Sequence, residues 1–174
     1  MDTKCAGDIM IPLEDYPHIP YWFTLRQAIA AIEKSEISFR GKKSLPRALL
    51  VFDEKYQLTG IVRRRDILRG LEPGFLAKKP TAGERKLFDV DVDPDLAELS
   101  FAKDIESIKE RAEVRISEVM APIIGTVNHG DHLSKIIYVM LSKDIHLLPV
   151  TKNGKVVGVV RSVDVFNEVA DLLL

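Results

Sequence analysis

The sequence predicts an α+β protein built from two copies of one β-α-β-β-α unit. The first observation is a repeated phrase, because Gly60-Ile-Val-Arg-Arg-Arg-Asp66 returns as Gly158-Val-Val-Arg-Ser-Val-Asp164, each followed by two apolar residues. The second observation is that similar segments precede both copies, starting at Asp8-Ile-Met-Ile-Pro and Glu118-Val-Met-Ala-Pro. Self-similarity of this kind fixes the architecture before any single residue is interpreted.

Each copy contains a helix between its lead segment and its apolar strands. Thr24 and Gln27 form the pattern of a capping box, which predicts a helix from there to about Ser35. In the second copy Asp131 is the expected N-cap, and the helix should end near Lys143. The apolar residues recur at helical spacing in both segments, so each helix has one buried face.

Two apolar strands and a second helix complete each unit. Asn153-Gly154 is the strongest short hairpin signal, and it predicts antiparallel strands over 147–151 and 156–161. The counterparts in the first copy are 49–52 and 58–63, joined by a longer turn. Helices should follow over 66–71 and 163–173. We expect the last helix to bury one apolar face, formed by Val165, Phe166, Val169, Ala170 and Leu173.

Two segments break the symmetry. Residues 37–47 are an insertion of roughly ten residues in the first copy, with lysines, Gly41 and Pro46, and we predict a surface loop. Residues 73–113 form a connector that begins with prolines and an acidic stretch and ends in a helix from about 94 to 113. The predicted organisation is therefore a first repeat over 1–72, a connector over 73–114 and a second repeat over 115–174.

The composition excludes several function classes. The 174 residues contain 25 Lys and Arg against 26 Asp and Glu, so no global field attracts nucleic acid or an anionic membrane. No apolar run approaches the ~20 residues that span a bilayer. The N-terminus does not resemble a signal peptide, and the single Cys5 cannot form an internal disulfide. We expect a cytoplasmic protein without nucleic-acid or membrane partners.

The doubled series of motifs resembles the CBS domain family, named after cystathionine β-synthase, over residues 7–70 and 115–174. The resemblance implies a Bateman module, in which two repeats pack through their sheets with pseudo-two-fold symmetry. It also implies a homodimer that regulates an unidentified partner protein. The expected ligand is an adenosine-containing molecule in the clefts between the repeats: AMP, ADP, ATP or S-adenosylmethionine. No catalytic motif, metal site or resident cofactor is expected.

The resemblance places the ligand at the end of each repeated phrase. Asp66 and Asp164 keep the position of an aspartate that can accept both ribose hydroxyls, beside a helix N-terminus that favours phosphate. The alternative is a plain helix cap that needs no ligand. The usual Ser or Thr three residues earlier is replaced by Arg63 and Arg161. These arginines either bind the ligand's phosphates or fill the clefts, and Arg65 is a further candidate from the same basic run.

Other candidate ligand residues also follow from the resemblance. His146 and its counterpart Arg47 precede the central strands, where a cation would approach phosphates, although a solvent-facing His146 needs no ligand. An aromatic such as Tyr16 would stack on a purine or belong to the core. The residues that match the stretch lining base and ribose are Tyr16, His18, Ile124 and Thr126. Two functions stay open: a nucleotide sensor, or a dimerisation module whose clefts are filled by Arg63 and Arg161.

Overall fold

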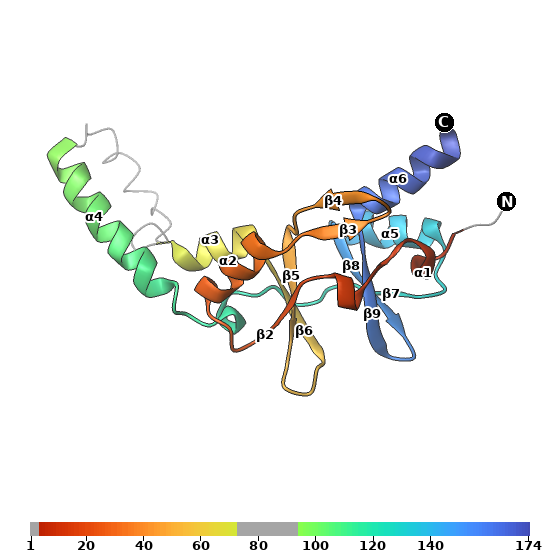
Figure 1. Ribbon diagram of the computed structural model, residues 1–174, viewed down its shortest axis with the longest axis horizontal. Helices are drawn as coiled ribbons and strands as arrows, with labels where there is room; N and C mark the ends of the chain where they lie inside the picture. The colour runs from red at the N-terminus through yellow and green to blue at the C-terminus, as the bar shows by residue number, and fades with distance from the viewer. Residues whose placement is uncertain (1–3, 73–93) are drawn as a thin grey trace.

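The computed structural model describes residues 4–72 and 94–174, with the side chains of 94–102 left out. Helices and strands alternate in two similar halves, and the predicted α+β class is confirmed. One half is built on a three-stranded sheet of order β2-β5-β6 and the other on a four-stranded sheet of order β1-β9-β8-β7. Figure 1 shows the two sheets side by side at the centre of the molecule, with α2, α3, α5 and α6 above them and α4 to the left.

The first half has the predicted order of elements. Strand β2 runs parallel to β5, and β5 pairs antiparallel with β6. Thr24 accepts the backbone N–H of Gln27, so the capping box predicted for α2 is present. The elements are β2 (His18–Pro20), α2 (Leu25–Lys34), β5 (Ala48–Phe52), β6 (Leu58–Arg63) and α3 (Arg64–Leu71).

The second half repeats this arrangement. Strand β7 is parallel to β8, and β8 pairs antiparallel with β9 across the Asn153-Gly154 turn. Both turn residues have positive φ, 53° and 77°, which explains why Asn and Gly stand there. The elements are β7 (Val127–Asn128), α5 (Leu133–Lys143), β8 (Leu147–Lys152), β9 (Lys155–Arg161) and α6 (Ser162–Leu173).

The lead segments of the two halves are exchanged. Helix α1 (Ala6–Ile9) and strand β1 (Ile11–Pro12) lie on the second half, where β1 pairs antiparallel with β9. The short helix η3 (Ile116–Glu118) and the residues after it lie on the first half, where Ala121 forms a bridge with Ile61. Each half therefore depends on the other's lead segment.

The glycine of the repeated phrase is explained by this exchange. A Cβ atom on Gly158 would lie 2.5 Å from the carbonyl oxygen of Ile11, and one on Gly60 would lie 2.9 Å from that of Ala121. Both approaches are too close for any side chain. The motif glycines thus mark the places where the backbone of one repeat crosses that of the other.

A shared hydrophobic core joins the two sheets. Side chains from both halves and from the segment between β1 and β2, which includes the 3-10 helix η1 (Leu13–Asp15), contribute to it. Its fully or nearly fully buried members are Ile11, Tyr16, Ile37, Leu50, Phe52 and Val159. Each half also has a core of its own beneath its helices.

Three local predictions are wrong. The segment 37–47 is not a plain loop but a hairpin of β3 (Ile37–Phe39) and β4 (Lys42–Ser44), because Ile37 is buried and the turn residues adopt positive φ. Asp131 does not cap α5. His132 is the N-cap, and the Asp131 carboxylate instead accepts from the Asn128 N–H and the Lys135 ammonium.

The buried face of α6 also differs from the predicted one. Asp164, Val165 and Glu168 are buried, whereas Phe166 and Leu173 are exposed. The prediction assigned apolar residues to the core by spacing alone. In the structure the inward face carries two carboxylates whose charges are matched by cations from other elements.

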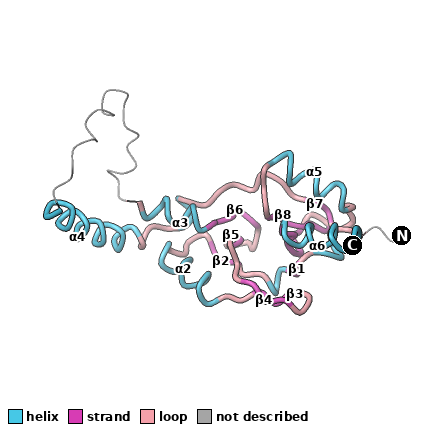
Figure 2. The backbone as a smooth tube through the Cα atoms, turned by 90° about the horizontal axis from the view of Figure 1, so that it is seen from above, coloured by secondary structure: helices cyan, strands magenta, loops and turns pink. Residues whose placement is uncertain are grey.

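Helix α4 (Pro94–Arg111) extends away from the two sheets beside α3, as Figure 2 shows from above. It ends two residues before the predicted position, and Arg111 Nε donates to the carbonyl of Gly70 at 2.7 Å. The acidic stretch 89–93 and the rest of the connector 73–93 lie outside the described residues. None of the helices in the described ranges combines the length and apolar character that a membrane span requires.

Candidate functional site

Asp66 lies at the junction of β6 and α3, where Arg63 donates hydrogen bonds to both oxygens of its carboxylate. Its Oδ2 accepts the backbone N–H of Arg63 at 2.9 Å and the Nε–H of the same residue at 2.8 Å. Its Oδ1 accepts from Arg63 Nη2 at 3.0 Å. The Asp66 side chain is 1% exposed, and the N-cap of α3 is Arg63 rather than Asp66. Asp66 is the third helical residue, and its carboxylate completes a capping box by accepting the Arg63 N–H.

The charge balance at Asp66 favours the ionised form. Burial is the largest single effect and would raise the pKa of its carboxyl. The side-chain and backbone hydrogen bonds from Arg63, together with the charges of Arg63 and Arg69, outweigh it. The pKa of Asp66 is therefore held below its ordinary value, and the residue stays ionised at neutral pH.

Asp164 occupies the same position at the junction of β9 and α6. Its Oδ2 accepts from Arg161 Nε at 2.7 Å and, more weakly, from the Arg161 backbone N–H at 3.3 Å. Its Oδ1 accepts from Arg161 Nη2 at 2.7 Å. Planar, two-point pairing of this kind is the strongest that an arginine and a carboxylate make.

The two sites differ in what covers the arginine. Arg161 Nη1 also donates to the Ser44 hydroxyl at 2.8 Å, so the inserted hairpin reaches the second site. The side chain of Arg161 is 17% exposed, whereas that of Arg63 is 48% exposed. The first site is thus open to solvent on its arginine side, and the second is closed.

Tyr16 contributes to the closed site from inside the molecule. Its ring is buried in the core between the sheets, and its hydroxyl donates to the carbonyl of Ala48 at 2.7 Å. Burial raises the pKa of this phenol above its usual range, while the charges of Arg161 and Asp164 act on it in opposite directions. Tyr16 is therefore a core residue, and no face of its ring is free to stack on a purine.

The remaining predicted residues on the rim of the two sites are exposed. Arg65 lies between Arg63 and Asp66 in the chain. Arg47 precedes Ala48, which pairs with Arg63 across the sheet. His146 precedes Leu147, the partner of Arg161 in β8, and its carbonyl accepts the N–H of Ser162. Ile124 and Thr126 lie before β7, and neither forms a hydrogen bond to Asp164 in the described part of the chain.

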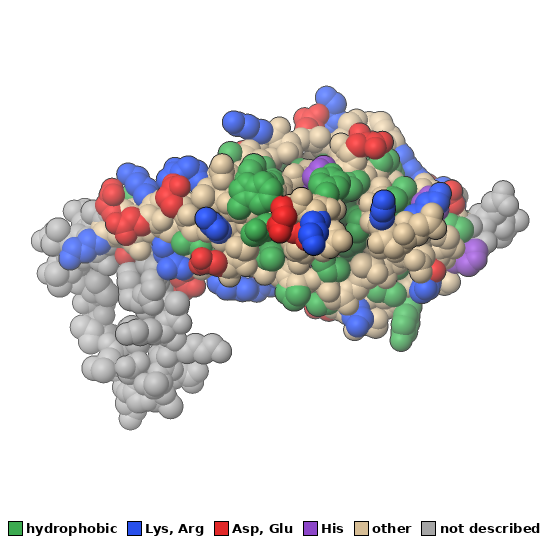
Figure 3. Space-filling view, turned by 90° about the horizontal axis from the view of Figure 1, so that it is seen from below, with side chains coloured by type: hydrophobic (Ala, Val, Ile, Leu, Met, Phe, Trp, Pro, Cys, Tyr) green, Lys and Arg blue, Asp and Glu red, His purple; other side chains and the backbone are tan. Residues whose placement is uncertain are grey.

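His18 belongs to a different place. Its Nε2 lies 2.7 Å from the Tyr56 hydroxyl and its Nδ1 lies 2.9 Å from the carbonyl of Tyr16. It lines a cavity of about 220 Å³ with Trp22 and Phe52, at the opposite end of β5 from Ala48. Figure 3 shows the molecule from below, where hydrophobic side chains are exposed at the surface with charged ones beside them.

Comparison with known proteins agrees with the doubled architecture. Residues 116–171 match the family profile described as "CBS domain". CBSX2 from Arabidopsis thaliana, a CBS-pair protein, is 18% identical with a TM-score of 0.64, over 98% of this chain and 96% of that one. The chain has the fold of a tandem CBS-domain pair.

Other solved CBS structures agree with this assignment, although no curated protein matches the sequence. The CBS domain of a membrane protein from Sphaerobacter thermophilus is 21% identical, with a TM-score of 0.64, over 95% of this chain and 87% of that one. CBSX2 in complex with AMP is 18% identical, with a TM-score of 0.61, and 97% of each chain is covered.

The structure adds residues that sequence reasoning missed. Ser44, Arg40 and the buried Glu168 all belong to contacts at or near the Arg161–Asp164 pair. The insertion that carries Arg40 and Ser44 is visible in the sequence as the unequal length of the two repeats. Its contacts are not, because contacts between residues more than a hundred positions apart leave no local pattern.

Proposed function

We propose that this CBS pair is a regulatory module that binds one adenine nucleotide per chain, at its first cleft, and signals its occupancy to a partner. The observation that carries the proposal is the contrast between the two clamped aspartates. Arg63 is half exposed, and in the described part of the chain its side chain donates hydrogen bonds to Asp66 alone. Arg161 is largely buried and is also held by the hairpin.

Binding at the first cleft would proceed by exchange of partners. The ribose hydroxyls would take over the carboxylate oxygens of Asp66, and the Arg63 guanidinium would turn outward to the phosphate. Arg64, Arg65 and Arg69 on α3 and the exposed Arg47 add positive charge around this end of the sheet. The N-terminus of α3 favours an anion in the same place. The AMP complex of CBSX2, a chain of the same fold, supports adenosine as the ligand class.

Calorimetry with AMP, ADP, ATP and S-adenosylmethionine tests the proposal. We expect saturable binding with one site per chain. Asp66→Asn should weaken it at least about tenfold, because the amide keeps one acceptor oxygen and its NH2 group cannot accept from the second ribose hydroxyl. Asp164→Asn is the matched control and should leave binding unchanged. No heat with any of the four ligands at millimolar concentration would exclude the proposal.

A second candidate function is a CBS pair that binds no nucleotide and acts through association. The observation in its favour is that in both clefts the aspartate is already satisfied by the arginine of its own chain. Association would use the exposed apolar side chains of the last two helices, and we propose a homodimer formed through them. They are Tyr138 and Leu141 on α5 and Phe166, Leu172 and Leu173 on α6.

A ligand regulates such a module only through different affinities for two arrangements of the repeats. The exchanged lead segments supply a physical route, because α1 and β1 join the second half while their chain continues into the first. A change at the start of α3 would alter the packing of the two halves against their shared core. The proposed partner protein would bind the two resulting arrangements with different affinities.

A further inference from the structure

The inserted hairpin lies across the boundary between the two repeats. Strands β3 and β4 pair antiparallel through Ser38 and Lys43, and Arg40 and Gly41 form the turn with φ of 51° and 75°. Figure 1 shows the hairpin extending from the first repeat towards α6 and α1 of the second half. Ile37 anchors its base in the core between the sheets. The second repeat has no counterpart, since Asp144–His146 lead directly from α5 to β8.

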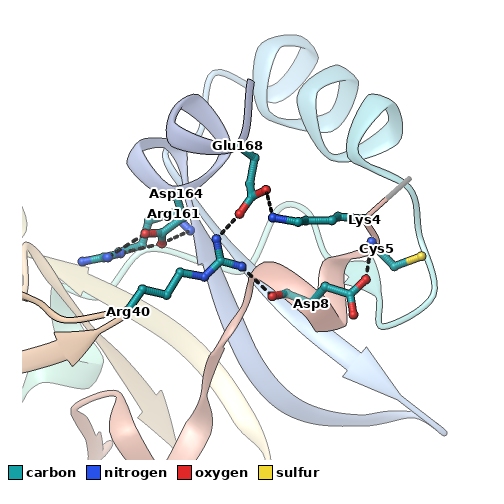
Figure 4. Close-up of polar contacts among 7 residues, drawn as sticks. All are labelled: Lys4, Cys5, Asp8, Arg40, Arg161, Asp164 and Glu168. Carbon is teal, nitrogen blue, oxygen red and sulfur yellow. Dashed lines mark hydrogen bonds and ion pairs between the residues drawn. The ribbon is translucent and has the colours of Figure 1, made fainter. Parts of the chain in front are cut away.

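The tip of the hairpin is fastened by an ion pair between the exposed Arg40 and the buried Glu168. One guanidinium nitrogen of Arg40 donates to Glu168 Oε1, and the other donates to the carbonyl of Asp8 at 2.7 Å. Glu168 is 3% exposed, and Lys4 Nζ donates to its second oxygen at 2.5 Å. Figure 4 shows the Arg40 side chain entering between α6 and the N-terminal segment.

This carboxylate is held in its charged form by the two cations. Burial is the largest single effect and would raise the pKa of Glu168, but the hydrogen bonds and positive charges of Lys4 and Arg40 together keep that pKa below its ordinary value. A buried charge that loses one partner is costly. The contact between hairpin and α6 is therefore specific, and it lies one helical turn from Asp164.

The base of the hairpin contacts the Arg161–Asp164 pair itself. Ser44 accepts from Arg161 Nη1, while the other edge of that guanidinium grips Asp164. The two clefts share the same arginine-to-aspartate clamp, three residues apart. They differ in the hairpin contact, and the exposed fractions of Arg63 and Arg161 differ accordingly.

We propose that the β3–β4 hairpin is a strap that closes the second cleft, with the Arg40–Glu168 ion pair as its clasp. The strap covers the guanidinium of Arg161 and excludes anionic ligands from Asp164. It makes the two clefts unequal within one chain and leaves the first as the accessible one. The inference deepens the proposed function, but the closure itself does not depend on nucleotide binding.

Chemical accessibility of the arginines tests the strap without any ligand. The probe is phenylglyoxal, a neutral reagent for guanidinium groups, with modification followed residue by residue by peptide mass. In the unaltered protein we expect Arg161 to react at least about tenfold more slowly than Arg63. Arg63 is the internal reference, because it carries the same clamp without the hairpin.

Substitutions in the clasp should then open the second cleft alone. Arg40→Ala and Ser44→Ala should each raise the Arg161 rate about fivefold or more and leave the Arg63 rate unchanged. Lys43→Ala is the matched control. It removes a cation from the same hairpin, but one whose partner is the exposed Glu36 at 3.2 Å, so the Arg161 rate should not change.

Two results would overturn the strap. One is equal reactivity of Arg63 and Arg161 in the unaltered protein, and the other is an unchanged Arg161 rate in both folded variants. If Arg40→Ala does not fold, Ser44→Ala carries the test alone. Protection of Arg63 by AMP is a separate measurement: its failure would count against the proposed function and leave the strap standing.

Discussion

Arg161 binds Asp164 through both carboxylate oxygens and at the same time donates to Ser44, a residue 117 positions away in the chain. Arg63 binds Asp66 in the same two-point manner, and none of the described residues gives it such a distant partner. The repeated sequence phrase therefore produces one local structure in two tertiary settings. The difference between these settings is the basis of the proposals, and it can be tested by substitution.

Replacing Arg63 distinguishes two roles for its guanidinium, which either binds the phosphate of the ligand or fills the cleft as a plug. We expect Arg63→Thr to weaken AMP binding several-fold while adenosine binding changes little, because the guanidinium is proposed to contact only the phosphate. Calorimetry with the two ligands measures this difference. If Arg63 is a plug, the same substitution will instead create or strengthen the binding of both. Arg161→Thr serves as the control at the closed site.

The crossing glycines should be intolerant of a side chain. Gly158→Ala places a methyl group 2.5 Å from the Ile11 carbonyl oxygen, and we expect a loss of about 1–3 kcal/mol in the free energy of unfolding. Urea denaturation measures it. Gly130→Ala is the matched control, because no atom lies within 4 Å of its added Cβ. Equal stability of the two variants would contradict the exchanged packing of the lead segments.

The Tyr16 hydroxyl should contribute to stability without any ligand. Tyr16→Phe keeps the ring in the core but leaves the Ala48 carbonyl without this 2.7 Å hydrogen bond, at an expected cost of about 1 kcal/mol. The control is Tyr138→Phe, whose ring is exposed and whose stability should not change. If Tyr16→Phe also abolishes nucleotide binding at the first cleft, its assignment as a core residue alone is wrong.

Acid should destabilise the fold through the buried carboxylates. The pKa values of Asp66 and Glu168 are lowered in the folded state, so their stabilising contribution is complete above the unfolded values, near 3.9 and 4.3. It is lost as the pH falls through the still lower folded values. We expect a nearly constant urea midpoint from pH 7 to pH 5 and a steep decrease below about pH 4.

A single substitution isolates the Glu168 part of that pH dependence. Glu168→Gln should reduce stability at pH 7 and flatten the decrease below pH 4, because one of the titrating groups has been removed. Glu106→Gln is the control, since Glu106 is an exposed residue of α4. A decrease as steep as in the unaltered protein would show that Glu168 does not take part.

The exposed helical face should mediate association. We expect a dimer by analytical ultracentrifugation, and Leu141→Glu or Phe166→Glu should convert it to a monomer. Both side chains are exposed in the single chain, so the monomer should fold normally. Trp22→Glu, on an exposed apolar residue outside these helices, should leave the dimer intact. A monomeric unaltered protein would rule out the proposed homodimer.

Much of the fold follows from local chemistry. Thr24 with Gln27, Asn153 with Gly154, and the alternation of apolar runs with turns predict α2, the β8–β9 hairpin and the order of elements. These signals act over a few residues, and each is satisfied within its own segment. The duplication then supplies the two-fold arrangement, because equal units bury equal faces against each other.

The local errors have a common cause. The hairpin at 37–47 looks like a loop because its lysines and Gly41 are polar or flexible, and only its burial of Ile37 against the other sheet makes it a structure. On α6, apolar spacing predicts Phe166 on the buried face, whereas the structure buries Glu168 and leaves Phe166 exposed. The inward position of Glu168 is stable because Lys4 and Arg40 arrive from distant segments and compensate its charge.

The sequence by itself determined the two repeats, their β-α-β-β-α order and the positions of Asp66 and Asp164 at two helix starts. Whether each arginine clamps its aspartate, and which of the two clamps is covered, was decided only by the tertiary structure. The physical reason is that a guanidinium selects among acceptors by their position in space. Ser44 and the clasp at Glu168 are brought to the second cleft by packing between the repeats, and no spacing along the chain encodes that proximity.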